Sequence, residues 1–329
     1  MDIGLLVLLA VLFGFSGGSI YYVYRYRGRE RFADFTEYVR KGWPIFTPLN
    51  CVLYLCTAKR AKPAIMDVTQ FPELAELQAN WQIIREEAIA LHASKQLEAA
   101  KSPDSAAYYD VGFRTFYKYG WSKFYLNWYG YTHASAQATC PRTVEILKRI
   151  PAVNGAMFSL LPAGSQLTRH LDPIASSLRY HLGLSTPNDD RCWINIDGTT
   201  YSWRDGEPLL FDETFLHHAK NETEQPRLIL MCDVRRPMNL FGRAFNFVIR
   251  QLLRMSIVPN TAADRRGLGN RIFATLAPLL ARTKQLKQTN KTLYTLIKHT
   301  INLLLLLIAV GILVGIYFAV TRLLVPLFH

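Results

Sequence analysis

Two histidines, one aspartate and one arginine could carry metal chemistry in this sequence. His170 and Asp172 form a His-x-Asp pair, His217 follows 45 residues after the aspartate, and Arg227 follows ten residues later. Two imidazoles and a carboxylate make the facial triad of non-haem Fe(II) oxygenases. The arginine is suited to hold the far carboxylate of a 2-oxoglutarate co-substrate. Zinc hydrolysis is the chemical alternative, but the chain has no HExxH-type helix and Arg227 would have no obvious role in it.

The spacing of His170 and Asp172 lets both bind one metal ion, because side chains at i and i+2 of a strand point the same way. With His217 they form a facial set that leaves positions open for a chelating 2-oxo acid and for O2. Two other histidines compete for these roles. His218 would point to the opposite face of an extended backbone. His181 could be a ligand or could hydrogen-bond a bound carboxylate.

Several short apolar runs, separated by turns, could position these side chains. Each run ends at a turn rich in Pro, Gly, Asn or Asp, such as Asp197-Gly198. The runs are Ala156–Leu161, Leu178–Leu184, Cys192–Ile196, Thr200–Trp203, Leu209–Leu210 and Arg227–Val234. Short strands at this spacing predict a β sandwich or barrel.

Two further patterns precede these strands. Apolar residues recur at three- and four-residue steps from Phe71 to about Ala100 and predict a helix. Aromatic residues dominate from Val111 to Tyr131, with turns at Gly120 and Gly130, and favour strands. These aromatics fit either a packed β core or the wall of a substrate channel, and the sequence leaves both readings open.

Apolar segments lie at both ends of the chain. Residues 301–321 carry no charge and are long enough to span a hydrocarbon core of roughly 30 Å. Ile3–Tyr24 is also uncharged, and arginines at 25, 27, 29 and 31 follow it. The positive-inside rule then places the intervening domain in the cytoplasm. We expect an anchor at 1–25, a basic juxtamembrane or interfacial segment at 26–70, a catalytic domain at 71–238, a basic amphipathic helical region at 239–300 and a transmembrane helix at 301–325.

Positive charge is concentrated before the second apolar segment. The formal net charge is +13, and residues 241–300 hold eleven Lys or Arg against one acid, Asp264, which gives +10. A basic amphipathic stretch beside a membrane anchor is suited to an anionic lipid surface. Retention of topology is the simpler alternative. Nucleic acid is not expected as a partner, since no nucleic-acid motif is visible.

The region from about Phe71 to Pro237 resembles the aspartyl/asparaginyl β-hydroxylase family of Fe(II)/2-oxoglutarate dioxygenases. Six segments carry the resemblance and cover much of the predicted strands. They are Phe158-Ser-Leu-Leu-Pro-Ala-Gly164, His170-Leu-Asp-Pro173, Leu178-Arg-Tyr-His-Leu-Gly-Leu184, Trp203-Arg-Asp-Gly206, Phe211-Asp-Glu-Thr-Phe-Leu-His217 and Arg227-Leu-Ile-Leu-Met-Cys-Asp-Val234.

This resemblance implies a mainly β fold with flanking helices, in which a double-stranded β-helix (a jelly roll) holds Fe(II) at its mouth. It implies metal binding by His170 and His217. It also implies contacts with 2-oxoglutarate by Ser159, Arg179, His181 and Arg227. The animal protein hydroxylases of the family have glycine where this chain has Asp172, so the carboxylate ligand is inferred from the residues themselves and from bacterial members.

Among the bacterial members, the lipid A acyl-chain 2-hydroxylases of the inner membrane are similar to this chain. They face the cytoplasm and have apolar ends. An anchored site beside a basic surface suits a phosphorylated, acylated glycolipid, so the expected reaction is 2-hydroxylation of a lipid A acyl chain. Hydroxylation of an aspartyl or asparaginyl residue in a protein is the first alternative. A membrane-bound β-barrel binding module without turnover is the second.

Overall fold

The computed structural model describes residues 3–99, 102, 104–110, 112, 120–297, 300 and 311. The chain divides into two units by its internal contacts. One unit spans Gly18–Phe273, and the other takes residues 1–17 and 274–329. The first unit contains all the predicted site residues. The domain boundaries expected from the sequence stay a prediction.

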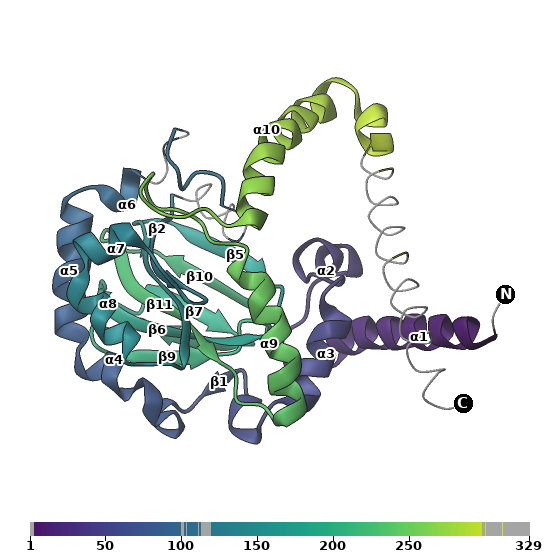
Figure 1. Cartoon of the computed structure of the whole chain (residues 1–329), viewed down its shortest axis with the longest axis horizontal. Helices are drawn as coiled ribbons and strands as arrows, with labels where there is room; N and C mark the ends of the chain where they lie inside the picture. Colours follow the sequence, from purple (N-terminus) through teal and green to yellow (C-terminus); the bar gives the residue numbers. More distant parts are fainter. Residues whose placement is uncertain are drawn as a thin grey trace, which may run out of the picture. The chain divides into compact units, whose positions relative to one another are not determined.

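Eight strands of the larger unit are divided equally between two sheets. They are β4 (Val153–Leu161), β5 (Gln166–His170), β6 (Ser177–Ser185), β7 (Cys192–Ile196), β8 (Thr199–Ser202), β9 (Pro208–Phe211), β10 (His217–Asn221) and β11 (Arg227–Arg235). The major sheet has the order β1-β9-β6-β11-β4-β2-β3, and the minor sheet has the order β5-β10-β7-β8. Six of the seven connections from β4 to β11 cross from one sheet to the other, the β7–β8 hairpin being the exception, and the named strands pair antiparallel, so the fold is a double-stranded β-helix, or jelly roll (Figure 1). The predicted fold class is confirmed in this respect.

Three strands extend the major sheet at its edges: β1 (Ile65–Met66), β2 (Ser122–Trp128) and β3 (Tyr131–Thr132). Part of the aromatic segment predicted to form strands therefore does so, while residues 113–119 lie outside the described residues. Side chains of β2 alternate between two cores. Trp121 and Tyr125 face the space between the sheets, and Phe124 and Leu126 face the helices.

The outer face of the major sheet is covered by helices. These are α4 (Ala75–Ala79), α5 (Trp81–Ala93), α6 (Gln96–Ala99), α7 (Ala134–Thr139) and α8 (Pro141–Lys148), with short 3-10 turns η1 (Lys59–Ala61), η2 (Val68–Gln70) and η3 (Pro72–Leu74) before them. The helix expected over 71–100 is thus present in pieces. In α5 the buried residues Ile84, Ala88 and Leu91 recur at helical spacing and pack in the core that includes Leu182 of β6.

The two sheets differ in polarity. Strands β4 and β11 are buried along almost their whole length, because helices cover one face and the minor sheet covers the other. In the minor sheet, β10 alternates between buried and half-buried residues, and β5 has no fully buried residue. The predicted metal ligands His170 and His217 belong to these two polar strands.

Near its N-terminus the larger unit receives the end of α1 (Ile3–Arg25), followed by α2 (Phe35–Lys41) and α3 (Thr47–Cys56). Within the described part of the chain, α1 is the one helix long and apolar enough to cross a membrane. Its length and composition fit a membrane anchor or a signal sequence. The transmembrane helix expected at 301–325 falls outside the described residues, apart from Gly311.

The basic region after the barrel forms two helices, α9 (Leu240–Arg254) and α10 (Leu268–Thr289). The chain between them is not helical and packs on the barrel. There, Ile257 and Val258 are buried, and the side-chain amide of Asn260 donates to the carbonyl of Tyr125 over 2.8 Å. This connection holds the end of α9 against β2.

Candidate active site

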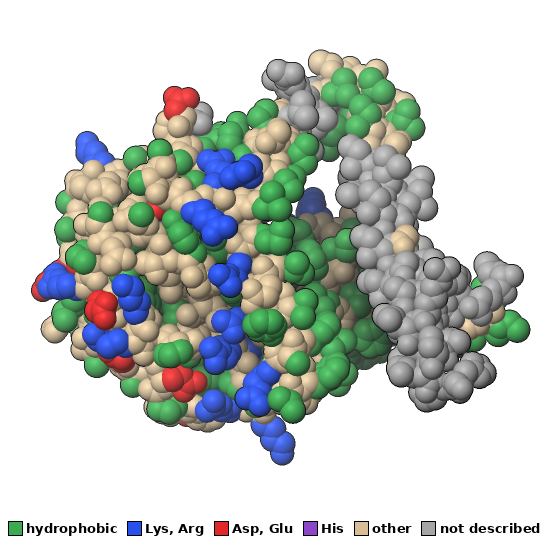
Figure 2. Space-filling view, in the orientation of Figure 1, with side chains coloured by type: hydrophobic (Ala, Val, Ile, Leu, Met, Phe, Trp, Pro, Cys, Tyr) green, Lys and Arg blue, Asp and Glu red, His purple; other side chains and the backbone are tan. Residues whose placement is uncertain are grey.

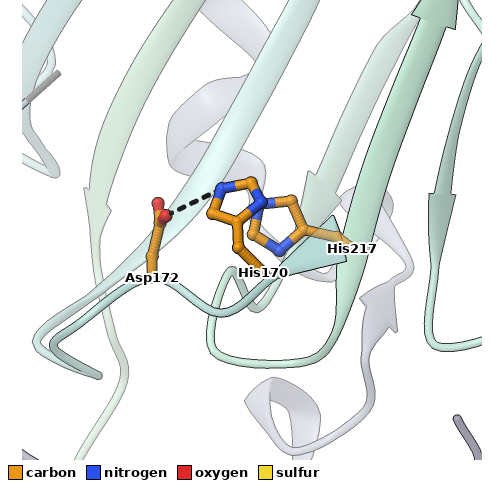
Figure 3. Close-up of side chains that lie close together, drawn as sticks. All are labelled: His170, Asp172 and His217. Atoms are coloured by element: carbon orange, nitrogen blue, oxygen red, sulfur yellow. Dashed lines mark ion pairs between the residues drawn. The ribbon is translucent and has the colours of Figure 1, made fainter. Parts of the chain in front are cut away.

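His170, Asp172 and His217 come together at one end of the space between the sheets. His170 is the last residue of β5 and pairs in register with His217, the first residue of β10. Asp172 follows β5 directly. The possible ligand atoms of the three side chains lie within 4.8 Å of one another, and the His170 Nε2 to Asp172 Oδ1 distance is 3.4 Å (Figure 3).

Backbone carbonyls orient both imidazoles. The Nδ1 atoms of His170 and His217 lie 2.8 and 2.9 Å from the carbonyl oxygens of Thr168 and Phe215. With Nδ1 donating to the carbonyl, each ring keeps Nε2 as a free metal ligand, as second-sphere partners of metal-binding histidines commonly arrange. Burial, and then the charge of His170, lowers the pKa of His217 to about 3. The ring is therefore neutral, which metal binding requires.

Asp172 is held by the buried guanidinium of Arg179, whose Nη2 lies 3.0 Å from its Oδ2. Burial raises the pKa of Asp172, but the hydrogen bond with His170 and the charge of Arg179 outweigh it and keep that pKa well below its usual range. Arg179 also pairs with Glu213 and, at 2.8 Å, with Asp233. The backbone carbonyl of Glu213 accepts from the Asp172 amide at 2.9 Å. Asp172 is thus a fixed, anionic side chain beside the two histidines.

Arg227 lies at the far end of the same cavity in different surroundings. Its side chain is fully buried, and its guanidinium sits over the rings of Trp203 and Trp121, at 4.3 and 5.1 Å from their centroids. It donates to the Ser159 hydroxyl over 3.4 Å, while its Nε has no hydrogen-bond partner. Burial lowers its pKa to about 10. No carboxylate among the described residues pairs with it, so it fits an anionic ligand.

His181 supplies a neutral donor between the two ends. Its Nδ1 accepts from Trp203 Nε1 over 3.4 Å, and its buried Nε2 has no partner. Burial, followed by the charges of Arg227 and Arg179, holds the pKa of His181 well below its usual value. The imidazole is therefore neutral and offers its Nε2–H to a ligand.

One cavity joins these groups. Its volume is about 410 Å³ including its mouth, and His170, Asp172, Arg179, His181, His217 and Arg227 all line it. Ser159 is buried beside Arg227. The apolar wall consists of Trp121, Leu167, Ile194, Trp203, Phe211, Ala219 and Met231. The donor set of two imidazoles and one carboxylate fits an Fe(II) ion, and the polar cleft beyond it fits a dicarboxylate.

The structure brings together every residue assigned to the site from the sequence. His218 lies on the other side of β10, with its ring 5.4 Å from that of Trp193. His181 is not part of the cluster of possible ligands. Sequence reasoning missed Glu213 and Asp233, although both fall in the segments that carry the resemblance. Both acids are buried in the structure, and the spacing of residues in a sequence does not reveal which acids are buried.

The model of the aspartyl/asparaginyl β-hydroxylase family matches residues 78–237. The ornithine lipid ester-linked acyl 2-hydroxylase of Rhizobium tropici is 30% identical over 202 residues, which are 61% of this chain and 70% of that protein. Human aspartyl/asparaginyl β-hydroxylase is 29% identical over 178 residues, 51% of this chain but only 22% of that protein. A prolyl-4-hydroxylase structure from Pseudomonas putida aligns with 48% of this chain and 87% of its own, at 16% identity and a TM-score of 0.32.

Proposed function

This chain belongs to the aspartyl/asparaginyl β-hydroxylase family, and on that premise we propose that it hydroxylates the 2-position of an acyl chain in a membrane lipid. It is a hydroxylase of the 2-oxoglutarate dioxygenase type, and its family uses Fe(II) and 2-oxoglutarate. One observation carries the assignment of the site: a His-Asp-His cluster shares a cavity with a buried arginine that no carboxylate among the described residues pairs with.

In this proposal His170, Asp172 and His217 hold Fe(II). When bound, the metal and 2-oxoglutarate supply oxidative decarboxylation of the co-substrate and activation of O2 for insertion of one oxygen atom into a C–H bond. These three side chains would hold the ion, and their carbonyl and guanidinium partners fix their orientation.

Arg227 binds the distal carboxylate of 2-oxoglutarate, with Ser159 beside it. This pair is strong because the guanidinium is already desolvated and no charge competes for it. The Nε2–H of His181 points to the same ligand. Arg179 is the fourth predicted co-substrate contact. It lines the cavity and pairs with Asp172, so it would orient Asp172 and also contact the bound 2-oxoglutarate. The indoles of Trp121 and Trp203 exclude water from the site.

A lipid substrate is supported by two features. The named activity of the Rhizobium tropici relative is 2-hydroxylation of an ester-linked acyl chain. The second is α1, which suits a membrane anchor. The sequence suggested lipid A as the lipid, whereas this relative favours an aminolipid such as ornithine lipid. The chemistry common to both is an acyl chain whose 2-carbon adjoins a carbonyl.

A membrane surface for this domain is offered by α9. Its inner face packs through Gly242, Asn246 and Ile249, and its outer face exposes apolar and basic residues together. The exposed apolar residues are Leu240, Phe241, Phe247, Val248 and Leu252. Figure 2 shows a band of Lys and Arg side chains with hydrophobic neighbours on the face where α9 lies. Such a face suits an anionic lipid surface. We therefore infer a location at the cytoplasmic side of a bacterial plasma membrane.

The test is mass spectrometry of lipids from cells with and without the gene, in a host that makes both ornithine lipid and lipid A. We expect one lipid class to gain a species heavier by one oxygen atom, with the hydroxyl on the 2-carbon of an acyl chain. His217→Ala should abolish this species and His218→Ala should keep it. Unchanged acyl chains in both lipid classes would exclude the proposal.

Protein hydroxylation is the second candidate, because the chain also matches human aspartyl/asparaginyl β-hydroxylase. A proteome-wide search for hydroxylated Asp and Asn in the same cells separates the two functions. Hydroxylated residues that depend on His217, with unmodified lipids, would favour the protein substrate.

A further inference from the structure

The chain just after α1 folds against the loops that carry the metal ligands. We call residues 27–31 the juxtamembrane clamp. The Arg27 guanidinium pairs with Asp212 through Nη2 at 2.9 Å and donates from Nη1 to the Thr214 carbonyl at 2.9 Å. Only 8% of the Arg27 side chain and 1% of the Asp212 side chain are exposed. This arginine therefore lies inside the protein, although the sequence suggested only a role in membrane topology.

The same arginine reaches the residue that orients His217. Its guanidinium lies between the rings of Tyr54 and Phe215, 3.8 Å from each centroid. The carbonyl of Phe215 is the acceptor for His217 Nδ1. Arg27 thus fixes both the side chain and the flanking backbone of a residue that holds a metal ligand.

A second contact of the clamp fixes the strand beside His217. The amides of Arg29 and Glu30 donate to Asp197 Oδ1 at 2.6 and 3.0 Å. The Asp197 amide in turn donates to the Leu216 carbonyl at 2.8 Å. Gly28, with a φ of +82°, makes this approach possible, because a Cβ there would collide with the Asp197 carboxylate.

A third contact reaches the other histidine. The Arg169 guanidinium donates to the Arg31 carbonyl at 2.9 Å and pairs with Glu30 at 3.1 Å. Arg169 directly precedes His170. The next residue, Leu171, donates its amide to the Lys41 carbonyl of α2 at 3.1 Å. The segment after α1 therefore touches the chain on both sides of His170.

We propose that the juxtamembrane clamp positions the two histidine ligands, with Arg27 as its principal positioning residue. This rests on the proposed metal site but adds that the site is completed by the segment next to the anchor. Residues 212–216 lead directly into the first residue of β10, so the contacts of Arg27 with Asp212, Thr214 and Phe215 bear on the position of His217. Removal of an outer partner of a metal ligand commonly changes metal affinity by about 10- to 100-fold, and Arg27 acts through Phe215, so we expect about 10-fold from its loss.

The fold should survive loss of Arg27, because Asp212 keeps a second partner. The buried Arg236 lies 2.8 Å from its carboxylate, and Thr214 donates to Asp212 Oδ1 through its amide and hydroxyl. Arg27→Gln removes the charge and the stacked guanidinium without leaving a lone buried acid. Arg27→Lys keeps the charge but loses the planar fork that makes both contacts.

The experiment uses the full chain in detergent and measures Mn²⁺ affinity from the electron paramagnetic resonance signal of the free ion. Co²⁺ absorption reports the ligand geometry, and thermal unfolding of the metal-free protein reports the fold. We expect Arg27→Gln to weaken Mn²⁺ binding by roughly 10-fold or more and to alter the Co²⁺ spectrum. Arg27→Lys should fall between it and the wild type. Arg40→Gln, which removes an exposed charge on α2, should match the wild type.

Wild-type affinity and an unchanged Co²⁺ spectrum in Arg27→Gln would overturn the clamp. If that variant does not fold, Arg27→Lys decides by the same two measurements. A wild type that binds no Mn²⁺ would overturn the proposed metal site itself, and the clamp with it. Failure of the clamp alone is therefore distinct from failure of the proposed function.

Discussion

Two buried arginines of the barrel have opposite surroundings. Arg179 contacts three carboxylates, those of Asp172, Glu213 and Asp233, and their charges raise its pKa above the usual value despite burial. Arg227 has two indoles and a hydroxyl around it, and burial lowers its pKa to about 10. An isolated buried charge is costly unless a partner neutralises it.

The two arginines therefore give the two ends of the cavity different electrostatic environments. At the end that holds Asp172, three carboxylates surround one arginine; burial raises the pKa of Glu213 and of Asp233, whereas that of Asp172 is lowered, so Asp172 supplies the negative charge that a divalent cation would balance. At the far end, the cation lacks an acid, and a carboxylate of a ligand would balance it. A dicarboxylate that chelates the metal with one end and meets Arg227 with the other satisfies both.

The strongest test removes a ligand at the acidic end. His217→Ala should weaken Mn²⁺ or Fe(II) binding by more than about 100-fold, since loss of an outer partner alone costs up to that much. His218→Ala is the matched control on the other face of β10 and should bind metal normally. Isothermal titration of the two variants measures this. Equal affinities would refute the assignment of His217.

Removing the arginine at the far end should act on the co-substrate alone. Loss of one partner of a buried charge pair costs about 3–5 kcal/mol, so Arg227→Met should raise KM for 2-oxoglutarate by roughly 100- to 4000-fold. Metal affinity should stay at the wild-type value. Arg191→Met, on an exposed arginine, is the control. If Arg227→Met weakened metal binding and left KM for 2-oxoglutarate normal, the assignment of Arg227 to the co-substrate would be wrong.

A smaller effect is expected from an acid that holds Arg179. Glu213→Gln keeps the shape of the side chain but replaces the carboxyl group that contacts Arg179 with an amide. The position of Asp172 should loosen, and metal affinity should fall by about 10- to 100-fold. KM for 2-oxoglutarate should change less. Glu222→Gln, on an exposed acid of the neighbouring strand end, should change neither value. Unaltered metal affinity in Glu213→Gln would show that Glu213 does not help to position Asp172 through Arg179.

The smallest effect concerns pH. Burial and the two arginines hold the pKa of His181 well below its usual value. The unfolded chain therefore binds a proton at this residue between its folded pKa and about 6.5, where the native state does not, so stability falls as pH falls below about 6.5. One unit lower, this residue costs about 1.4 kcal/mol. In the metal-free protein, His181→Gln should lose less stability than the wild type when the pH falls from about 6.5 to about 5.5. Urea unfolding at the two pH values measures the free energy of unfolding of each protein. The same dependence of stability on pH in His181→Gln and in the wild type would contradict this prediction.

Much of the fold could be predicted, and the part that could not has a physical reason. The strands of the major sheet are apolar on both faces, so the runs around Phe158, Leu182 and Leu230 predicted β4, β6 and β11 almost to their ends. Strand β10, which reads His-His-Ala-Lys-Asn, was not predicted as a strand. Its polar residues lie at the candidate site or on a half-exposed face. A search for alternating apolar residues therefore does not find this strand.

The sequence by itself determined the chemistry of the site. The His-x-Asp pair, the later histidine and the arginine name the ligand types and their order, and the surrounding segments name the family. Only the tertiary structure decided which cations are paired. Arg27, Arg179 and Arg227 are the same residue type in the sequence, yet Arg27 contacts the loop before His217, Arg179 contacts three acids, and Arg227 pairs with no carboxylate among the described residues. Charge compensation depends on distance and burial, and these are set by how the two sheets and the segment after α1 pack together.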